Sequence, residues 1–107
     1  MALTRDFKET VRARVQRDSA FRKALLIEGV EAFLGGDVDT GKAVLRDCIN
    51  ATVGFGKLAK AVKRSPKSLM RMLGPDGNPQ AQNLFEIIAF LQREEGVHLR
   101  VRLAKAS

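Results

Sequence analysis

The sequence GFGKLAKAVKRSPKSLMRMLG, residues 54–74, decides the fold and carries most of the charge. Apolar residues recur at three- and four-residue steps on both sides of Ser65-Pro66, a serine cap followed by a first-turn proline. This pattern predicts two short helices, one over about 55–62 and one from about Pro66 onward. The stretch holds six basic residues and no acidic one, whereas the whole chain has a net charge of +7.

The sequence before this stretch is also predicted to be helical. Phe7, Val11 and Val15 recur every four residues and predict a first helix over about 5–17. A second helix is expected from an Asp18 cap to the glycine pair at 35–36, and a third opens at Asp37 or Asp39. Cys48 lies on the apolar side of the third helix, so we interpret it as a small core residue.

After the basic stretch, the chain is expected to form a turn, a long helix and a strand. The turn covers residues 74–77, and Asn78-Pro79 gives a cap-plus-proline signal for a helix over about 79–95 that ends at Gly96. From residue 97 the apolar period changes to two, which predicts a strand with one apolar face. The four apolar residues of that face, our candidates for dimerisation, are Val97, Leu99, Val101 and Leu103.

A single strand must pair outside its own chain, because its backbone donors and acceptors are otherwise unmatched. Its copy in a second molecule, forming an antiparallel ribbon across a two-fold axis, is the simplest partner. A disordered basic tail is the alternative. The predicted fold is therefore all-α, a bundle of about six helices with a C-terminal β-strand. It forms one compact domain in which the N-terminal helices of residues 1–34 pack on a body of residues 35–107.

The composition and charge of the chain limit the classes of function that it can have. A pI near 10.2 favours a polyanion or an acidic protein as partner. The sequence shows no signal peptide and no apolar run of membrane-spanning length, so we expect a cytoplasmic protein without a membrane partner. With one cysteine and one histidine, His98, it offers no disulfide, metal set or cofactor motif. No catalytic pair is recognisable either, so we expect no enzyme. His98 is interpreted as a surface residue.

The basic stretch matches the requirements of a helix pair that enters the major groove of DNA. The second helix would leave four side chains free to contact base edges: Lys67, Ser68, Met70 and Arg71. Arg71 has the chemistry for a bidentate contact to guanine. Six further residues are better placed for phosphates, where they would set the register: Lys57, Lys60, Lys63, Arg64, Ser65 and Asn78.

Three segments together resemble a known family: FGKLAKA at 55–61, SPKSLMRML at 65–73 and GNP at 77–79. They are similar to the antidote proteins (antitoxins) of addiction modules, which have a Cro/repressor-type helix-turn-helix. The resemblance covers about residues 35–103. The chain departs from the common repressor pattern at Lys63 and Arg64, where the turn usually holds glycine and an apolar residue.

The resemblance implies a dimeric transcriptional repressor that binds an inverted-repeat operator in double-stranded DNA. It also implies a partner, a small toxin of the ribonuclease type, and hence a toxin-antitoxin pair that regulates its own operon. Two alternatives stay open. The first is a toxin-neutralising interaction module with weak DNA binding, and the second is a stand-alone regulator of the prophage type.

Overall fold

The computed structural model describes residues 18–106, and within this range the chain forms five α-helices and no strand. The first predicted helix, about 5–17, lies outside the described residues. The other five predicted helices are all present, so the helical class is confirmed for the described chain. Close backbone contacts join α2 with α3, α3 with α4, α4 with α5, and α6 with both α2 and α4.

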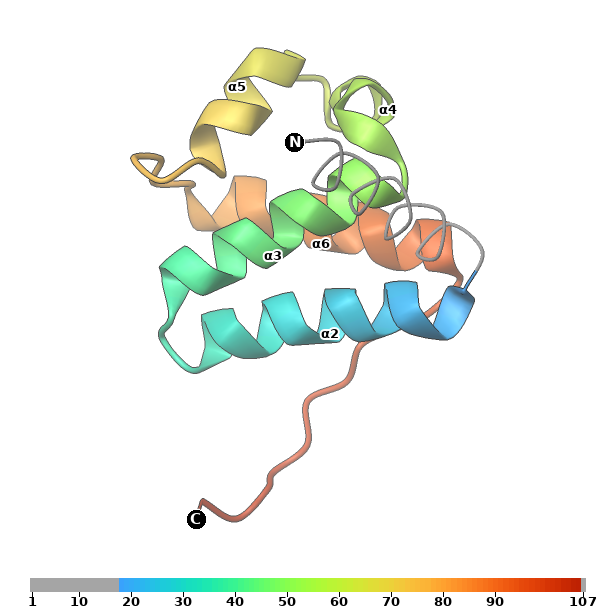
Figure 1. Ribbon diagram of the computed structural model, residues 1–107, viewed down its shortest axis with the longest axis vertical. Helices are drawn as coiled ribbons and strands as arrows, with labels where there is room; N and C mark the ends of the chain where they lie inside the picture. Colours follow the sequence, from blue (N-terminus) through green and yellow to red (C-terminus); the bar gives the residue numbers. More distant parts are fainter. Residues whose placement is uncertain (1–17, 107) are drawn as a thin grey trace, which may run out of the picture.

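The helices α2 (Ser19–Leu34) and α3 (Val38–Ala51) lie side by side as a hairpin (Figure 1). Aspartates cap both helices as predicted. Asp18 accepts a hydrogen bond from the Phe21 N–H at 3.1 Å, and Asp37 accepts one from the Thr40 N–H at 3.2 Å. The two helices approach closely at Gly41, where a Cβ atom would lie 2.8 Å from the Phe33 ring. Only glycine fits between the helices there.

Three helices complete the body: α4 (Gly54–Val62), α5 (Pro66–Met72) and α6 (Ala81–Glu95). The start of α6 differs from the prediction. Its N-cap is Gln80, without a side-chain cap bond, because residues 77–80 form a segment without regular structure that ends extended at Gln80. The predicted end is confirmed, since Gly96 adopts a left-handed conformation with φ of 66°.

The core lies where α4, α5 and α6 meet the α2–α3 hairpin. Seven side chains are almost completely removed from solvent: Leu26, Leu45, Ile49, Leu58, Leu69, Leu73 and Ile87. The phenylalanines of the described chain differ in burial. Phe55 and Phe90 are buried, whereas Phe85 is 65% exposed on α6. An ion pair at 3.0 Å between Arg22 of α2 and Glu95 of α6 ties the first and last described helices together.

The predicted C-terminal strand is not confirmed. Residues 97–106 leave the end of α6 as a segment without ladder pairing, and Figure 1 shows them extending away from the body on the side opposite α4 and α5. Gln92 holds the start of this tail, since its side-chain oxygen accepts a hydrogen bond from the Leu99 N–H at 2.8 Å. A strand needs a neighbouring strand, and the described part of the chain offers none.

Candidate nucleic-acid interface

The turn between α4 and α5 is made by three residues at 63–65. Lys63 is in the left-handed region, with φ of 58° and ψ of 48°, and is the one non-glycine residue with a positive φ among those described. The following N–H, of Arg64, bonds back to the Ala59 carbonyl at 3.1 Å, which closes the end of α4. The turn therefore keeps the conformation that glycine usually supplies, although a lysine occupies the position.

The start of α5 follows the prediction in detail. Ser65 is extended and its hydroxyl accepts a hydrogen bond from the Ser68 N–H at 3.1 Å, while Pro66 occupies the first turn. Pro66 has no N–H to leave unpaired at a helix start, so proline suits this position. Figure 1 looks almost along α4 while α5 runs across the view, so the two axes cross at a wide angle.

The candidate base-reading residues of α5 do not all face solvent equally. Lys67, Met70 and Arg71 are exposed, with Met70 at 47%. Ser68 is half-buried. The opposite face of α5 carries Leu69, which is fully buried. Burial of that face fixes which side of α5 is turned outward, and the three exposed residues share that side.

The candidate phosphate-binding residues on α4 and the turn are exposed, but two of them already have partners on α6. The Lys57 ammonium lies 2.5 Å from a Glu94 carboxylate oxygen, and the Arg64 guanidinium donates to the Asn83 side-chain oxygen, also at 2.5 Å. Exposed pairs of this kind contribute about 0–1 kcal/mol, so a phosphate group competes with them at small cost. Lys60, Lys63 and Ser65 remain exposed along the same edge.

The assignment of Asn78 to a helix start is wrong. It lies exposed in the loop after α5, two residues before the Gln80 cap and three before the first residue of α6. Its backbone amide is therefore not one of the unpaired donors of a helix N-terminus. Asn78-Pro79 has the composition of a cap, but the chain needs two further residues to reach the core position at which α6 begins.

The four candidate dimerisation residues separate into two pairs along the tail. Val97 and Leu99 are half-buried, and Leu99 packs against the chain's own core. Val101 is 84% exposed and Leu103 is fully exposed. The tail and α2 together line an open groove that includes Ile27 and Leu34 of α2, which are themselves exposed apolar residues.

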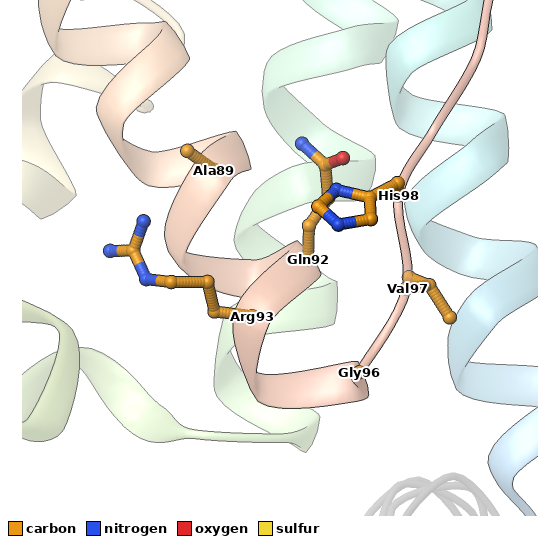
Figure 2. Close-up of a pocket in the computed structure, with 6 residues that line it drawn as sticks. All are labelled: Ala89, Gln92, Arg93, Gly96, Val97 and His98. Atoms are coloured by element: carbon orange, nitrogen blue, oxygen red, sulfur yellow. The ribbon is translucent and has the colours of Figure 1, made fainter.

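A pocket at the end of α6 and the buried thiol of Cys48 are two further features of the described chain. Figure 2 shows the pocket at the end of α6, where Gln92 and His98 are lining residues and Arg93 points away from His98. Burial raises the pKa of the Cys48 thiol from 9.0 to about 11, helped by the negative charge of Glu95. A thiol with such a pKa is protonated at neutral pH and is a poor nucleophile. Cys48 is a buried core residue, as predicted.

Sequence analysis missed two basic residues of α3, Lys42 and Arg46. Lys42 is 4% exposed, and its ammonium donates to the Gly77 carbonyl at 2.7 Å. Arg46 donates to the Leu73 carbonyl, which terminates α5, at 3.2 Å. A signal was present, because residues 42, 45, 46 and 49 share one face of a helix at three- and four-residue spacing.

Comparison of the chain with models of protein families, with curated proteins and with solved structures found no match. Within residues 18–106, no helix has the length and apolar character needed to cross a membrane. No group of histidine, cysteine and carboxylate side chains in that range is arranged to hold a metal ion. The geometry of α4 and α5 is therefore the main support for any functional assignment.

Proposed function

We propose that this protein is a sequence-specific DNA-binding transcriptional repressor that acts as a dimer, with α5 as the recognition helix. The observation that carries the proposal is the exposed face of α5. Lys67, Met70 and Arg71 project from a short helix whose opposite face is fixed in the core by Leu69. A helix presented at a wide angle to a supporting helix is the recurring element that enters the major groove.

Within this proposal, base contacts and phosphate contacts belong to different residues. Arg71 and Lys67 on α5 contact base edges, and a bidentate arginine–guanine contact discriminates by about 1–3 kcal/mol. Lys60 and Lys63, at the exposed end of α4, contact the DNA backbone and position α5 without reading sequence. Residues 54–74 include no acidic side chain, so no carboxylate of α4, α5 or the turn between them neutralises these cations.

The shape of the molecule supports a side-by-side dimer. The principal extents are 43 × 33 × 28 Å, and Figure 1 places α5 and the tail at opposite ends of the longest axis. Two protomers related by a two-fold axis along that direction would separate their α5 helices by about one protomer width. That width is close to one turn of DNA, roughly 34 Å, which is the spacing of two half-sites. The two tails would then meet at the end away from DNA.

Residues of the tail supply the contact surface in this dimer. Val101 and Leu103 are exposed beside the apolar groove on α2, so pairing of two tails would cover them. Replacement of both by aspartate should yield a monomer in sedimentation velocity. The matched control is Ala104→Asp, because Ala104 is an exposed neighbour on the other face of the predicted strand. A double variant that sediments like the parent chain rules out the tail as the interface.

DNA recognition is tested first with the parent chain and then with two variants. Selection from a pool of random-sequence duplexes gives the preferred site, and its inverted-repeat symmetry is the expected result. Lys67→Ala combined with Arg71→Ala should remove the preference for that site over a scrambled duplex. Lys60→Ala should weaken binding to both duplexes equally and lower the salt slope by roughly 0.9. Unchanged selectivity in the double variant contradicts the base-reading assignment.

The role as an antitoxin is a finer part of the proposal, and it depends on the resemblance of residues 55–79 to addiction-module antidotes. A toxin-neutralising module with weak DNA binding is the second candidate. The observation in its favour is the ion pair of Lys57 with Glu94, which places a carboxylate beside one of the candidate phosphate-binding residues. A shift of the selected duplex at physiological salt separates a repressor from a module with weak DNA binding. Co-expression with the product of the adjacent gene then separates either kind of antitoxin from a stand-alone regulator. A stand-alone regulator leaves that product's effect on growth unchanged, whereas an antitoxin relieves it.

A further inference from the structure

Two basic side chains of α3 hold the C-terminal end of α5. Arg46 donates to the Leu73 carbonyl at 3.2 Å, and Lys42 donates to the Gly77 carbonyl at 2.7 Å. The Pro75 carbonyl lies 3.5 Å from the same ammonium. Lys42 thus reaches from α3 into the loop that follows α5 and satisfies carbonyl groups that no helix or strand pairs.

The loop itself is pressed against the end of α5. A Cβ atom built at Gly77 would lie 2.2 Å from the Arg71 carbonyl oxygen and 2.4 Å from that of Met72, so no side chain fits there. The last carbonyls of a helix lack intrahelical partners and carry partial negative charge. The chain therefore closes the end of α5 with a compact turn, and two cations of α3 hold that turn.

These contacts matter because α5 is a short element with few other restraints. It has seven residues and its main helical neighbour is α4. Leu69 and Leu73 anchor its inner face and set which side of α5 is turned outward, but apolar contacts are not directional. Directional hydrogen bonds from a third helix fix the position of its far end. Lys42 and Arg46 bind carbonyls at that end, opposite the Ser65 cap.

We infer that Lys42 and Arg46 are positioning residues for base recognition, an inference that rests on the proposed DNA-binding function. They hold the end of α5 so that Lys67 and Arg71 meet base edges in register. Lys42 is 4% exposed, and its ammonium is occupied by loop carbonyls and by the Asp39 carboxylate at 3.5 Å, so it does not itself contact DNA. Its effect on recognition passes entirely through the orientation of α5.

A merely structural role makes a different prediction. A buried charged group often contributes little net stability compared with an apolar residue of the same size, but it can select one arrangement of the groups around it. Lys42→Met keeps a long unbranched side chain, one atom shorter than lysine, and removes the donors. If Lys42 only stabilises the fold, this variant changes the unfolding midpoint, while the folded fraction selects DNA as the parent chain does.

The experiment compares duplex selectivity in folded chains. The probe is the duplex selected by the parent chain, with a scrambled duplex as competitor, and the temperature is kept well below each unfolding midpoint. Lys42→Met should lower the ratio of the two affinities by about 5- to 150-fold, which is the value of one bidentate base contact. Its salt slope on the scrambled duplex should equal that of the parent chain, because no phosphate contact is lost.

Three further variants make the result interpretable. Lys23→Met is the matched control, since it removes the same charge from α2, outside the proposed DNA contacts and the tail, and should keep the parent selectivity. Arg46→Met should lose selectivity as Lys42→Met does, and Arg46→Lys, which retains a cation, should recover part of it. Circular dichroism establishes folding for each. If Lys42→Met does not fold, the comparison of Arg46→Met with Arg46→Lys takes its place.

Failure of the proposed function and failure of the positioning role give different experimental results. A parent chain that selects no sequence overturns the proposed function and, with it, this role for Lys42 and Arg46. A selective parent chain with equally selective Lys42→Met and Arg46→Met variants overturns the positioning role alone. A reduced salt slope for Lys42→Met also overturns it, because the lysine would then be a phosphate contact.

Discussion

The turn between α4 and α5 gives the sharpest test of the structure, through replacement of Lys63 by glycine. With φ of 58°, Lys63 pays the steric cost of the left-handed region, about 1–2 kcal/mol for a residue with a Cβ atom. Glycine avoids that cost but loses about 0.5–1 kcal/mol more backbone entropy on folding. The difference predicts that Lys63→Gly stabilises the protein by about 0.5–1 kcal/mol.

The matched control is the same substitution three residues earlier. Lys60 is also exposed and basic, but it lies inside α4, where glycine costs roughly 0.5–1 kcal/mol relative to a lysine. The two variants have the same composition and the same net charge, so their difference isolates the backbone conformation. Urea unfolding with a common m-value should separate them by about 1–2 kcal/mol.

Equal destabilisation by the two substitutions would refute the left-handed conformation of the turn. DNA binding provides a second, independent measurement, since each variant removes one cation from the proposed contacts with DNA phosphates. Each should lower the salt slope by roughly 0.9. Stability and salt slope would then move in opposite directions for Lys63→Gly and in the same direction for Lys60→Gly, so weaker DNA binding by the first variant cannot be attributed to loss of fold.

Five other substitutions test the packing, the ion pairs and the buried thiol. Gly77→Ala should destabilise by about 1–3 kcal/mol, because the new methyl group meets α5 carbonyls. Gly56→Ala, with open space around it in α4, should stabilise by up to about 1 kcal/mol, and thermal unfolding measures both. Glu95→Gln should cost about 1–3 kcal/mol because it breaks a largely buried ion pair with α2, whereas Glu94→Gln, at an exposed pair, should cost under about 1 kcal/mol in the same assay. Cys48 should resist alkylation by iodoacetamide at pH 8 until urea unfolds the chain. Its raised pKa also stabilises the fold fully below pH 9.0, and this contribution should fall away as pH rises through about 11, a loss that Cys48→Ala should not show.

The ends of the helices were predicted well where a capping side chain or a glycine determines them. Asp18, Asp37 and Ser65 each accept a hydrogen bond from a backbone N–H at the start of the helix that they cap. Gly96 ends α6 because a left-handed residue is needed there. These features depend on a few neighbouring residues, so one sequence suffices to predict them.

Signals that depend on distant parts of the chain failed or were incomplete. Asn78-Pro79 resembles a helix start, yet α6 begins at Ala81, where Leu84, Ile87 and Leu91 come into register with the core. The strand predicted from residue 97 has no partner in the described chain and does not form a ladder. Alternation of apolar residues predicts a strand, but formation of the strand depends on an edge that pairs with it.

Charge shows the same division between local and distant effects. Lys42 and Lys60 contribute equally to the net charge of +7, but only Lys60 is exposed to a polyanion. The Lys42 ammonium instead donates hydrogen bonds to backbone carbonyls of the loop after α5. A net charge therefore predicts the class of partner, whereas recognition of a particular sequence requires α5 to be held in one position. In the proposed recognition, Lys42 and Arg46 meet the second requirement, and composition alone does not distinguish their charges from those of the surface.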